Sequence, residues 1–210
     1  MSRDERDLVR EGYDALASRY LELRTARPSP DLLLMEDALA ELPDGARVLD
    51  AGCGAGLPVA RQLVERFRVT GVDISPVQIE MARENVPTAE FEVGDLSALE
   101  LREGTFDGIV CLFALFHLPR DEHATALAGF CQLLRPGGVL FLSIGSSDHE
   151  GYIEEDWIGS GASLYWSHFD QETTTGLVEA AGFTIDWVRV IEEDEEFGGG
   201  THPFVRARRL

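Results

Sequence analysis

Two features of this sequence have the clearest potential for chemistry. One is a set of carboxylates at the ends of apolar runs, and the other is a group of alternating glycines. Asp50 ends one apolar run and is followed by Gly52, Gly54 and Gly56, which permit positive φ and leave no Cβ between backbone and ligand. A second run ends at Asp73, whose two carboxylate oxygens suit a pair of ribose hydroxyls. The pattern predicts buried strands that stop at a nucleotide-binding loop.

The glycine spacing distinguishes between nucleotides. A dinucleotide-binding fingerprint requires G-x-G-x-x-G, but the sixth position counted from Gly52 is Leu57, so the third glycine is missing there. A nicotinamide oxidoreductase is also opposed by the lack of an evident second domain for its substrate. The pattern D-x-G-x-G-x-G instead resembles the first motif of the class I S-adenosylmethionine-dependent methyltransferases.

The resemblance to this family continues along the chain in the family's order. Gly94-Asp95-Leu96 looks like the turn that contacts adenine, residues 105–112 look like the fourth strand, and residues 133–142 look like the turn into the fifth. The resemblance implies an α/β, Rossmann-like, doubly wound fold. Its sheet would be seven-stranded and mostly parallel, with helices on both faces and an antiparallel last strand. The implied cofactor is S-adenosyl-L-methionine.

The resemblance also implies roles for individual residues. Asp50 would order the glycine loop or reach the methionine amino group through water, Asp73 would bind the ribose, and Asp95 would bind the adenine amino group. Ile74 and Leu96 would sandwich the purine ring. The cofactor-binding residues expected from these motifs are Tyr20, Asp50, Gly52, Cys53, Gly54, Asp73, Ile74, Gly94, Asp95, Leu96 and Leu112.

Strands and helices alternate from residue 47 onwards, which predicts a parallel sheet with helices on both faces. Ser75 and Asp170 are suited to cap the starts of two helices. An acidic, glycine-rich loop is expected to join the last two strands. The expected strands cover residues 47–50, 68–72, 90–93, 106–112, 138–143, 183–191 and 203–209, and the expected helices cover residues 8–23, 31–42, 58–66, 76–85, 121–134 and 171–181.

The first helix resembles the N-terminal helix that many small-molecule methyltransferases lay over the cofactor. Tyr13 and Tyr20 lie close to one stripe of it, where they would either pack the helix on the core or meet ligand, with Tyr20 favoured for ligand contact. At 210 residues, the chain is interpreted as one methyltransferase domain over 1–210, with a helical lid at 1–45.

Residues 145–169 depart from the alternation of strands and helices. They follow the fifth strand, where a short connection would suffice, and they are rich in aromatic residues. A substrate cap is expected at this edge of a parallel sheet, although a surface loop that packs its own aromatics would have the same composition. The expected substrate-binding residues are Tyr13, Tyr152, Trp157, Tyr165 and Trp166.

Two histidines are candidates for a catalytic base, because the pKa of imidazole suits proton transfer near neutral pH. His168 lies in the cap, and His117 follows the fourth strand. Many relatives carry a histidine at the second position that hydrogen-bonds structure near the cofactor, so a structural role is an alternative for His117. An amine, thiol or carboxylate acceptor would need no base, and aromatic side chains would then face the sulfonium through cation–π attraction.

Composition excludes several classes of partner. The chain has 38 acidic residues against 18 basic ones, all arginine, and a formal net charge of -20. Such a surface repels phosphate backbones and anionic membranes, so neither nucleic acid nor a membrane is expected as a partner. The lack of a signal peptide and of a bilayer-length apolar run favours a cytoplasmic protein. Three cysteines without a C-x-x-C pair predict no metal site.

These observations predict an S-adenosylmethionine-dependent methyltransferase that modifies a small-molecule acceptor and releases S-adenosylhomocysteine. The alternative is a protein that binds this nucleoside without methyl transfer, as a regulator or as the catalyst of another reaction. Neither the acceptor nor the choice between monomer and homodimer follows from the sequence.

Overall fold

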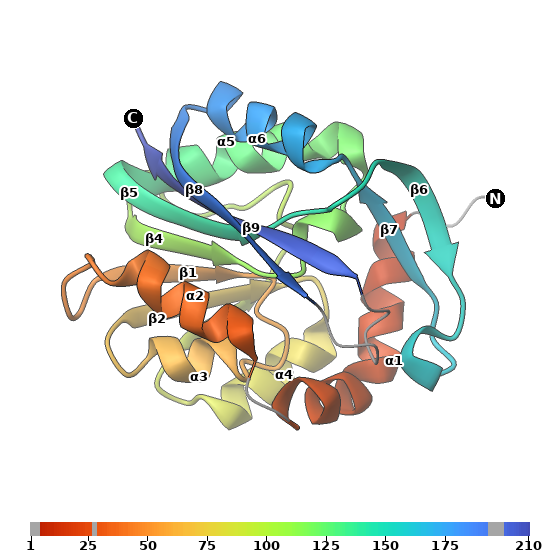
Figure 1. The fold of residues 1–210 in the computed structure, drawn as a ribbon. Helices are drawn as coiled ribbons and strands as arrows, with labels where there is room; N and C mark the ends of the chain where they lie inside the picture. Colours follow the sequence, from red (N-terminus) through yellow and green to blue (C-terminus); the bar gives the residue numbers. More distant parts are fainter. Residues whose placement is uncertain (1–4, 27–28, 193–199) are drawn as a thin grey trace.

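The computed structural model of the protein describes residues 5–26, 29–192 and 200–210, and its main sheet has seven strands in the order β3-β2-β1-β4-β5-β9-β8 (Figure 1). β9 runs antiparallel to both of its neighbours, and the other neighbouring strands are parallel. The predicted Rossmann-like sheet with an antiparallel last strand is therefore confirmed. Its strands are β1 (Arg47–Ala51), β2 (Arg68–Asp73), β3 (Glu90–Val93), β4 (Phe106–Cys111), β5 (Leu134–Ser143), β8 (Phe183–Glu192) and β9 (Thr201–Arg209).

Helices cover both faces of this sheet because alternate strand residues point to opposite sides. Val48 and Val110 pack with α2, α3 and α4, whereas their neighbours Leu49 and Ile109 pack with α5 and α6. Within the described ranges, no helix is both long and apolar enough to cross a membrane. The helices are α1 (Glu5–Thr25), α2 (Pro30–Leu39), α3 (Val59–Leu63), α4 (Pro76–Asn85), α5 (His123–Leu133) and α6 (Gln171–Ala180), with short 3-10 helices η1 (Leu115–His117), η2 (Arg120–Glu122) and η3 (Trp157–Gly159).

The predicted elements of the main sheet and its helices occur where expected, and the differences lie at their ends. Ser75 and Asp170 each accept a hydrogen bond from the backbone N–H three residues later, at 3.0 and 2.8 Å, which confirms both N-caps. β5 begins at Leu134, four residues earlier than predicted, because Leu134 already pairs with Phe106. The acidic loop predicted between β8 and β9 falls mainly on residues 193–199, which lie outside the described part of the chain.

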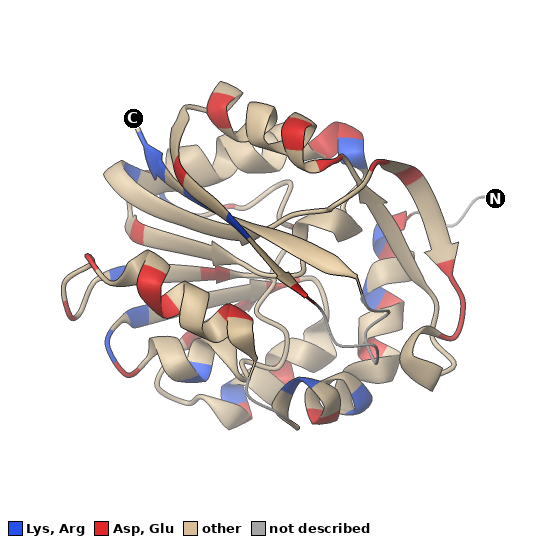
Figure 2. Cartoon of the chain, in the orientation of Figure 1, with Lys and Arg blue, Asp and Glu red and all other residues tan. Residues whose placement is uncertain are grey.

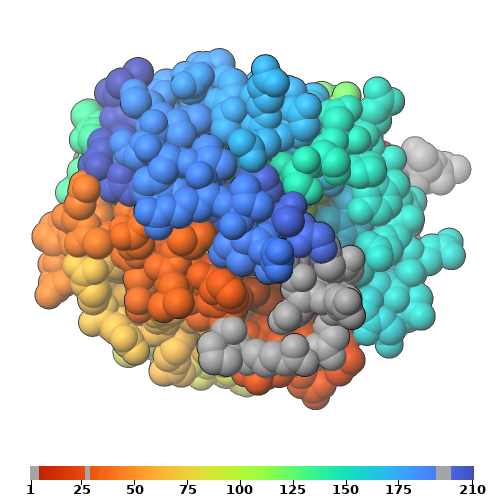
Figure 3. Space-filling model, in the orientation of Figure 1, coloured from red at the N-terminus to blue at the C-terminus, as the bar shows by residue number. Residues whose placement is uncertain are grey.

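Residues 145–169 contain a hairpin, which the sequence analysis did not predict. β6 (His149–Glu154) and β7 (Leu164–His168) form a separate two-stranded antiparallel sheet, with η3 between them. In Figure 3 this segment, coloured teal, forms one flank of the molecule beside the blue C-terminal strands. The segment is therefore an ordered substructure with its own strand pairing.

The hairpin packs against α1 rather than only against itself. Leu16 of α1 and Trp157 and Leu164 of the hairpin belong to one small apolar cluster, which Tyr13 borders. The backbones approach closely at Gly12, where an added Cβ would lie 2.6 Å from the Leu164 side chain. This contact brings the N-terminal helix and the hairpin together beside the sheet.

The register of the parallel strands brings two acidic residues to one edge of the sheet. Asp50 lies opposite Gly71 of β2 and Val110 of β4, and Asp73 lies opposite Val93 of β3. Gly71 leaves room for the glycine loop, since a Cβ there would lie 2.9 Å from Cys53 Sγ. The carboxyl ends of β1, β2 and β4 therefore meet above one region of the molecule.

We predict that His123, at the start of α5, makes stability depend on pH. The residue is 1% exposed, Nε2 donates to the Leu118 carbonyl at 3.2 Å, and burial lowers the pKa of the imidazole to about 4. The folded-state pKa lies below the unfolded value of about 6.5, so the contribution of neutral His123 to stability is complete above that pH and declines as the pH falls towards 4.

Between pH 7 and pH 5 this linkage removes about 2 kcal/mol of the free energy of unfolding. His123→Phe should therefore lose about 2 kcal/mol less than the wild type over this range, measured by urea denaturation. Thr125→Ala changes an exposed, non-titratable residue of the same helix, so it serves as the control and should keep the wild-type difference. Equal differences in wild type and His123→Phe would contradict the prediction.

Candidate functional site

Three adjoining cavities lie at the carboxyl ends of the parallel strands. An inner cavity of about 70 Å³ lies at the ends of β1, β2 and β4, and a loop cavity of about 40 Å³ continues it along residues 50–59. An outer cavity of about 320 Å³ lies on the hairpin side. Tyr20 and Phe113 line all three cavities, and Tyr13 lines the inner and outer ones. The three spaces therefore form one continuous site.

The glycine loop forms one wall of the inner and loop cavities. The backbone N–H groups of Gly52 and Cys53 both donate to the Val72 carbonyl, at 2.8 and 3.1 Å, so the loop is anchored on β2. Gly52 has φ +82°, and an added Cβ would lie 2.3 Å from the Ala114 side chain. Position 52 consequently requires glycine for both its conformation and its packing.

Asp73 holds the glycine loop in place. Its Oδ2 accepts from Gly54 N at 2.8 Å, and its Oδ1 accepts from Ser75 N at 2.9 Å. Burial raises the pKa of this carboxyl, and the backbone donors partly oppose that effect. Each oxygen keeps lone-pair capacity for a further donor on the inner cavity, which Asp73 lines.

Asp50 lies at the methionine end expected from the sequence and lines the loop cavity. The residue is 2% exposed, and its Oδ2 has no hydrogen-bond partner. Burial, with a smaller contribution from Asp73, raises the pKa of Asp50 to about 8. A buried carboxyl with an unused oxygen suits a cationic or donor group of a ligand.

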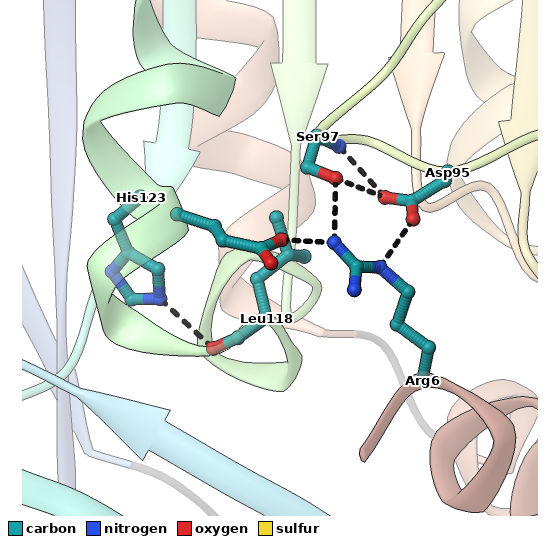
Figure 4. A network of polar contacts seen from close by, with 6 residues as sticks. Arg6, Asp95, Ser97, Leu118 and His123 are labelled. Atoms are coloured by element: carbon teal, nitrogen blue, oxygen red, sulfur yellow. Dashed lines mark hydrogen bonds and ion pairs between the residues drawn. The ribbon is translucent and has the colours of Figure 1, made fainter. Parts of the chain in front are cut away.

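Arg6 of α1 contacts the residue expected to bind adenine (Figure 4). Arg6 Nε donates to Asp95 Oδ2 at 2.6 Å, and the same guanidinium pairs with Glu122 and donates to Ser97 Oγ. Burial alone would raise the pKa of Asp95, but hydrogen bonds from Ser97 and Arg6 outweigh it and lower the pKa. Arg6 and Asp95 both line the inner cavity, so α1 supplies part of its wall.

Aromatic side chains from several elements surround the outer cavity. The Phe116 and Trp166 rings stack with centroids 5.4 Å apart and planes at 29°, and Trp157 meets Trp166 edge-on at 5.4 Å. These rings come from η1, β7 and η3, so the hairpin and the segment that follows β4 contribute to one wall. The predicted substrate residues that line this cavity are Tyr13, Tyr152, Trp157 and Trp166.

His168 lines the outer cavity with a defined tautomer. Its Nδ1 lies 2.7 Å from the Ser147 carbonyl, which can only accept, so Nδ1 carries the proton. Burial lowers the pKa of His168, and nearby His149 lowers it further, while the bond to Ser147 opposes them. The neutral ring therefore has its lone pair on Nε2, the state that a general base requires.

His117 lines the inner cavity, and both of its ring nitrogens have partners. Nδ1 lies 2.9 Å from the Tyr165 carbonyl and Nε2 lies 2.8 Å from the Tyr13 hydroxyl. Burial lowers the pKa of His117 to about 4, which the bond to Tyr165 only partly opposes. These contacts favour a positioning role for His117 and leave His168 as the better candidate base.

Two predicted residues lie away from the described cavities. Gly94 donates to the Asp73 carbonyl at 3.0 Å, and a Cβ on it would lie 2.8 Å from Val72, so it allows close packing behind the site. Tyr165 places its side chain over Gly151, and its carbonyl accepts from His117. All the other predicted cofactor-binding residues line the inner or loop cavity.

The structure adds lining residues that the sequence analysis missed. Phe113 has φ +55°, uncommon for a residue with a Cβ, and its N–H donates to Ser143 Oγ at 2.6 Å. Arg24 lies 5.0 Å from the Phe113 ring and pairs with Asp31 at 2.9 Å. Only the apolar run around Phe113 was visible in the sequence, and no motif marks Arg6 or Arg24. In the described part of the chain, no group of three or more His, Cys, Asp or Glu could hold a metal ion.

Comparisons with known proteins agree with this geometry. A family model described as a methyltransferase domain matches residues 48–138. The 2-methyl-6-phytyl-1,4-hydroquinone methyltransferase of Synechocystis is 32% identical over 167 residues, covering 71% of this chain and 52% of that protein. In its motifs, in this matched segment and in this relative, the chain is similar to the class I S-adenosylmethionine-dependent methyltransferase family. It spans about half the length of the curated relatives it matches first.

Solved structures show the same fold at lower sequence identity. Magnesium protoporphyrin IX methyltransferase from Synechocystis, with bound cofactor, has a TM-score of 0.74 at 18% identity and covers 100% of this chain and 99% of that chain. The cyclase SpnF has a TM-score of 0.75 at 17% identity, with coverage of 99% and 97%. The fold is therefore shared with a cyclase as well as with a methyltransferase.

The site fits S-adenosylmethionine, the cofactor of this family. Asp50 offers a buried, unpartnered oxygen to an amino group, and Asp73 offers acceptor capacity to hydroxyls. Ile74 and Leu96 supply apolar surface in the inner cavity. The donor and acceptor groups of this chain thus match the groups of an adenosyl amino acid.

We predict that cofactor binding at pH 7 releases a proton from Asp50. With a pKa of about 8, the free carboxyl is mostly protonated at pH 7, and a cationic amino group nearby favours its ionised form. Titration calorimetry in two buffers of different ionisation enthalpy should show release of nearly one proton. Asp50→Asn should abolish most of this release, and identical heats for the wild type in both buffers would refute the assignment.

We predict that Arg6 holds the start of α1 on the sheet. Arg6→Ala should speed backbone hydrogen exchange in the first two turns of α1 by about 5-fold, because partly exposed ion pairs contribute at most about 1 kcal/mol. Arg10→Ala is a matched control, since Arg10 pairs with Asp7 on the same helix at 3.0 Å. Equal exchange in both variants would show that the contacts of Arg6 with Asp95 and Glu122 do not fix the helix.

Proposed function

We propose that this protein transfers a methyl group from S-adenosylmethionine to a small-molecule acceptor held in the outer cavity. The observation that carries this proposal is the shared boundary of the cavities. Residues expected to bind the cofactor line the inner cavity, and aromatic side chains line the larger outer cavity. Tyr13, Tyr20 and Phe113 line both cavities. A methyl group passing from donor to acceptor has to cross this boundary.

The proposed contribution of the chain is mainly orientation. The bound cofactor supplies a methyl group on a positively charged sulfur. Asp50, Asp73 and the glycine loop would fix one end of the site, and the aromatic rings of the outer cavity would orient the acceptor and exclude water. Holding reacting atoms in line supplies much of the rate enhancement in such transfers.

His168 is the proposed base for an acceptor whose attacking atom carries a proton. Its Nδ1 donates a hydrogen bond to the Ser147 carbonyl, and the lowered pKa of the ring keeps Nε2 unprotonated near neutral pH. An acceptor hydroxyl beside Nε2 would give its proton to that nitrogen. His117 is proposed to position other groups, because its nitrogens are already bonded to Tyr13 and Tyr165.

Within one domain over residues 1–210, residues 1–45, which include α1, are the proposed lid, and residues 145–169, which include the hairpin, are the proposed cap. The net charge of -20 supports a small-molecule acceptor rather than nucleic acid, and in Figure 2 the acidic residues are spread over both helical layers and the hairpin. A cytoplasmic location is part of the proposal, supported by three free cysteines at Cys53, Cys111 and Cys131.

Binding of the cofactor without methyl transfer is the alternative. It is considered because the fold is shared with the cyclase SpnF. The two are separated by turnover with a panel of phenols, enols, carboxylic acids and amines, followed by detection of S-adenosylhomocysteine. Product formed with any acceptor class supports transfer. Cofactor binding with no product from any class supports the alternative.

We predict that calorimetry detects binding of S-adenosylmethionine and not of nicotinamide dinucleotides. Asp73→Ala should weaken binding by at least about 100-fold, since it removes charge-assisted hydrogen bonds of about 1.5 to 3 kcal/mol each. Asp107→Ala is the control, because Asp107 pairs with Arg135 near the start of β4 and away from the cavities. Preference for a dinucleotide, or unchanged affinity in Asp73→Ala, would contradict the assignment.

A further inference from the structure

We propose that His117 positions the Tyr13 hydroxyl at the boundary between the inner and outer cavities. There the hydroxyl oxygen acts as a hydrogen-bond acceptor. This oxygen favours binding of a positively charged methylsulfonium over binding of a neutral thioether. The inference rests on the proposed function, because it assigns this boundary to the reacting methyl group. It gives Tyr13 and His117 one joint role, distinct from binding the acceptor or removing its proton.

The direction of both hydrogen bonds follows from the partners. A carbonyl oxygen only accepts, so His117 Nδ1 donates its proton to the Tyr165 carbonyl at 2.9 Å. A neutral imidazole has one N–H, so Nε2 carries a lone pair and accepts from the Tyr13 hydroxyl at 2.8 Å. His117 is 6% exposed, and burial keeps its pKa near 4, so the neutral ring persists at physiological pH.

Tyr13 is thereby left with acceptor capacity alone. Burial raises the pKa of Tyr13 well above its usual value, so the group stays a phenol and its single proton is used by His117. The remaining lone-pair density of the oxygen attracts positive charge, and in a site shielded from water this attraction is stronger than in solution. A neutral thioether gains nothing comparable from the same oxygen.

The aromatic contacts of Tyr13 fix the plane of its ring. The ring meets His117 edge-on at 5.2 Å and 84°, Tyr20 at 5.6 Å and 75°, and Trp157 at 6.3 Å and 72°. These neighbours belong to η1, α1 and η3, so three separate elements restrict one side chain. Such restriction reduces the entropy lost when the oxygen contacts a ligand.

These contacts would also brace α1 if Tyr13 had no ligand, so the test needs a readout that bracing does not change. The ratio of dissociation constants for S-adenosylmethionine and S-adenosylhomocysteine is such a readout. The two ligands share every group except the methyl and its charge, so loss of bracing weakens both alike. Loss of an oxygen that recognises the cation weakens only the first.

Tyr13→Phe keeps the ring and removes the oxygen. We expect calorimetry to show about 5-fold weaker binding of S-adenosylmethionine, the size of one hydrogen bond, and less than about 2-fold change for S-adenosylhomocysteine. His117→Phe should shift the ratio in the same direction by freeing the Tyr13 proton. His117→Gln retains an acceptor oxygen for the Tyr13 hydroxyl and should restore part of the wild-type ratio.

Tyr165→Phe is the matched control, because Tyr165 lines none of the described cavities and its backbone carbonyl is retained; its ratio should equal that of the wild type. Equal weakening of both ligands in Tyr13→Phe, or His117→Phe and His117→Gln with the wild-type ratio, would overturn the inference and leave the proposed function intact. A wild-type protein that binds neither ligand would overturn the proposed function and the inference together.

Discussion

The hydrogen bond from the Gly54 backbone to the Asp73 carboxylate joins the loop after β1 to the end of β2, and the shape of the cofactor side depends on it. Parallel strands bring both ends to one edge, and Gly71 lets the loop fold back over β2. A buried carboxylate without donors is costly, so loop and carboxylate require each other. Asp73 thus both shapes the loop and offers hydrogen-bond acceptor oxygens to the inner cavity.

The outer cavity is built differently, mainly from elements outside the main sheet. α1 and the β6–β7 hairpin share a small apolar cluster, and two hydrogen bonds from α1 to the rest of the domain run from Arg6 to Asp95 and from Tyr13 to His117. Each link ends on a residue that lines the inner cavity. The two sides of the site are therefore mechanically connected, although they are separate in sequence.

The sequence predicted the sheet and its order of elements, and most of the expected cofactor-binding residues line the inner or loop cavity, because glycines and strand-end acids have local signatures. It did not predict the pairing of β6 with β7, since this depends on packing against α1, or Arg6, whose partners are about 90 or more residues away. The backbone conformation of Phe113 could not be predicted for a similar reason. Its positive φ depends on surrounding contacts, including the hydrogen bond to Ser143.

The close contact at Gly12 determines the distance between α1 and β7. The absence of a side chain there sets how near α1 lies to β7, and the rings between these two elements line the outer cavity. A residue that lines none of the three described cavities thereby sets the width of one of them. Variation at position 12 and at Leu164, which it contacts, offers evolution, or a protein engineer, a way to change the width of the outer cavity while its lining residues stay the same.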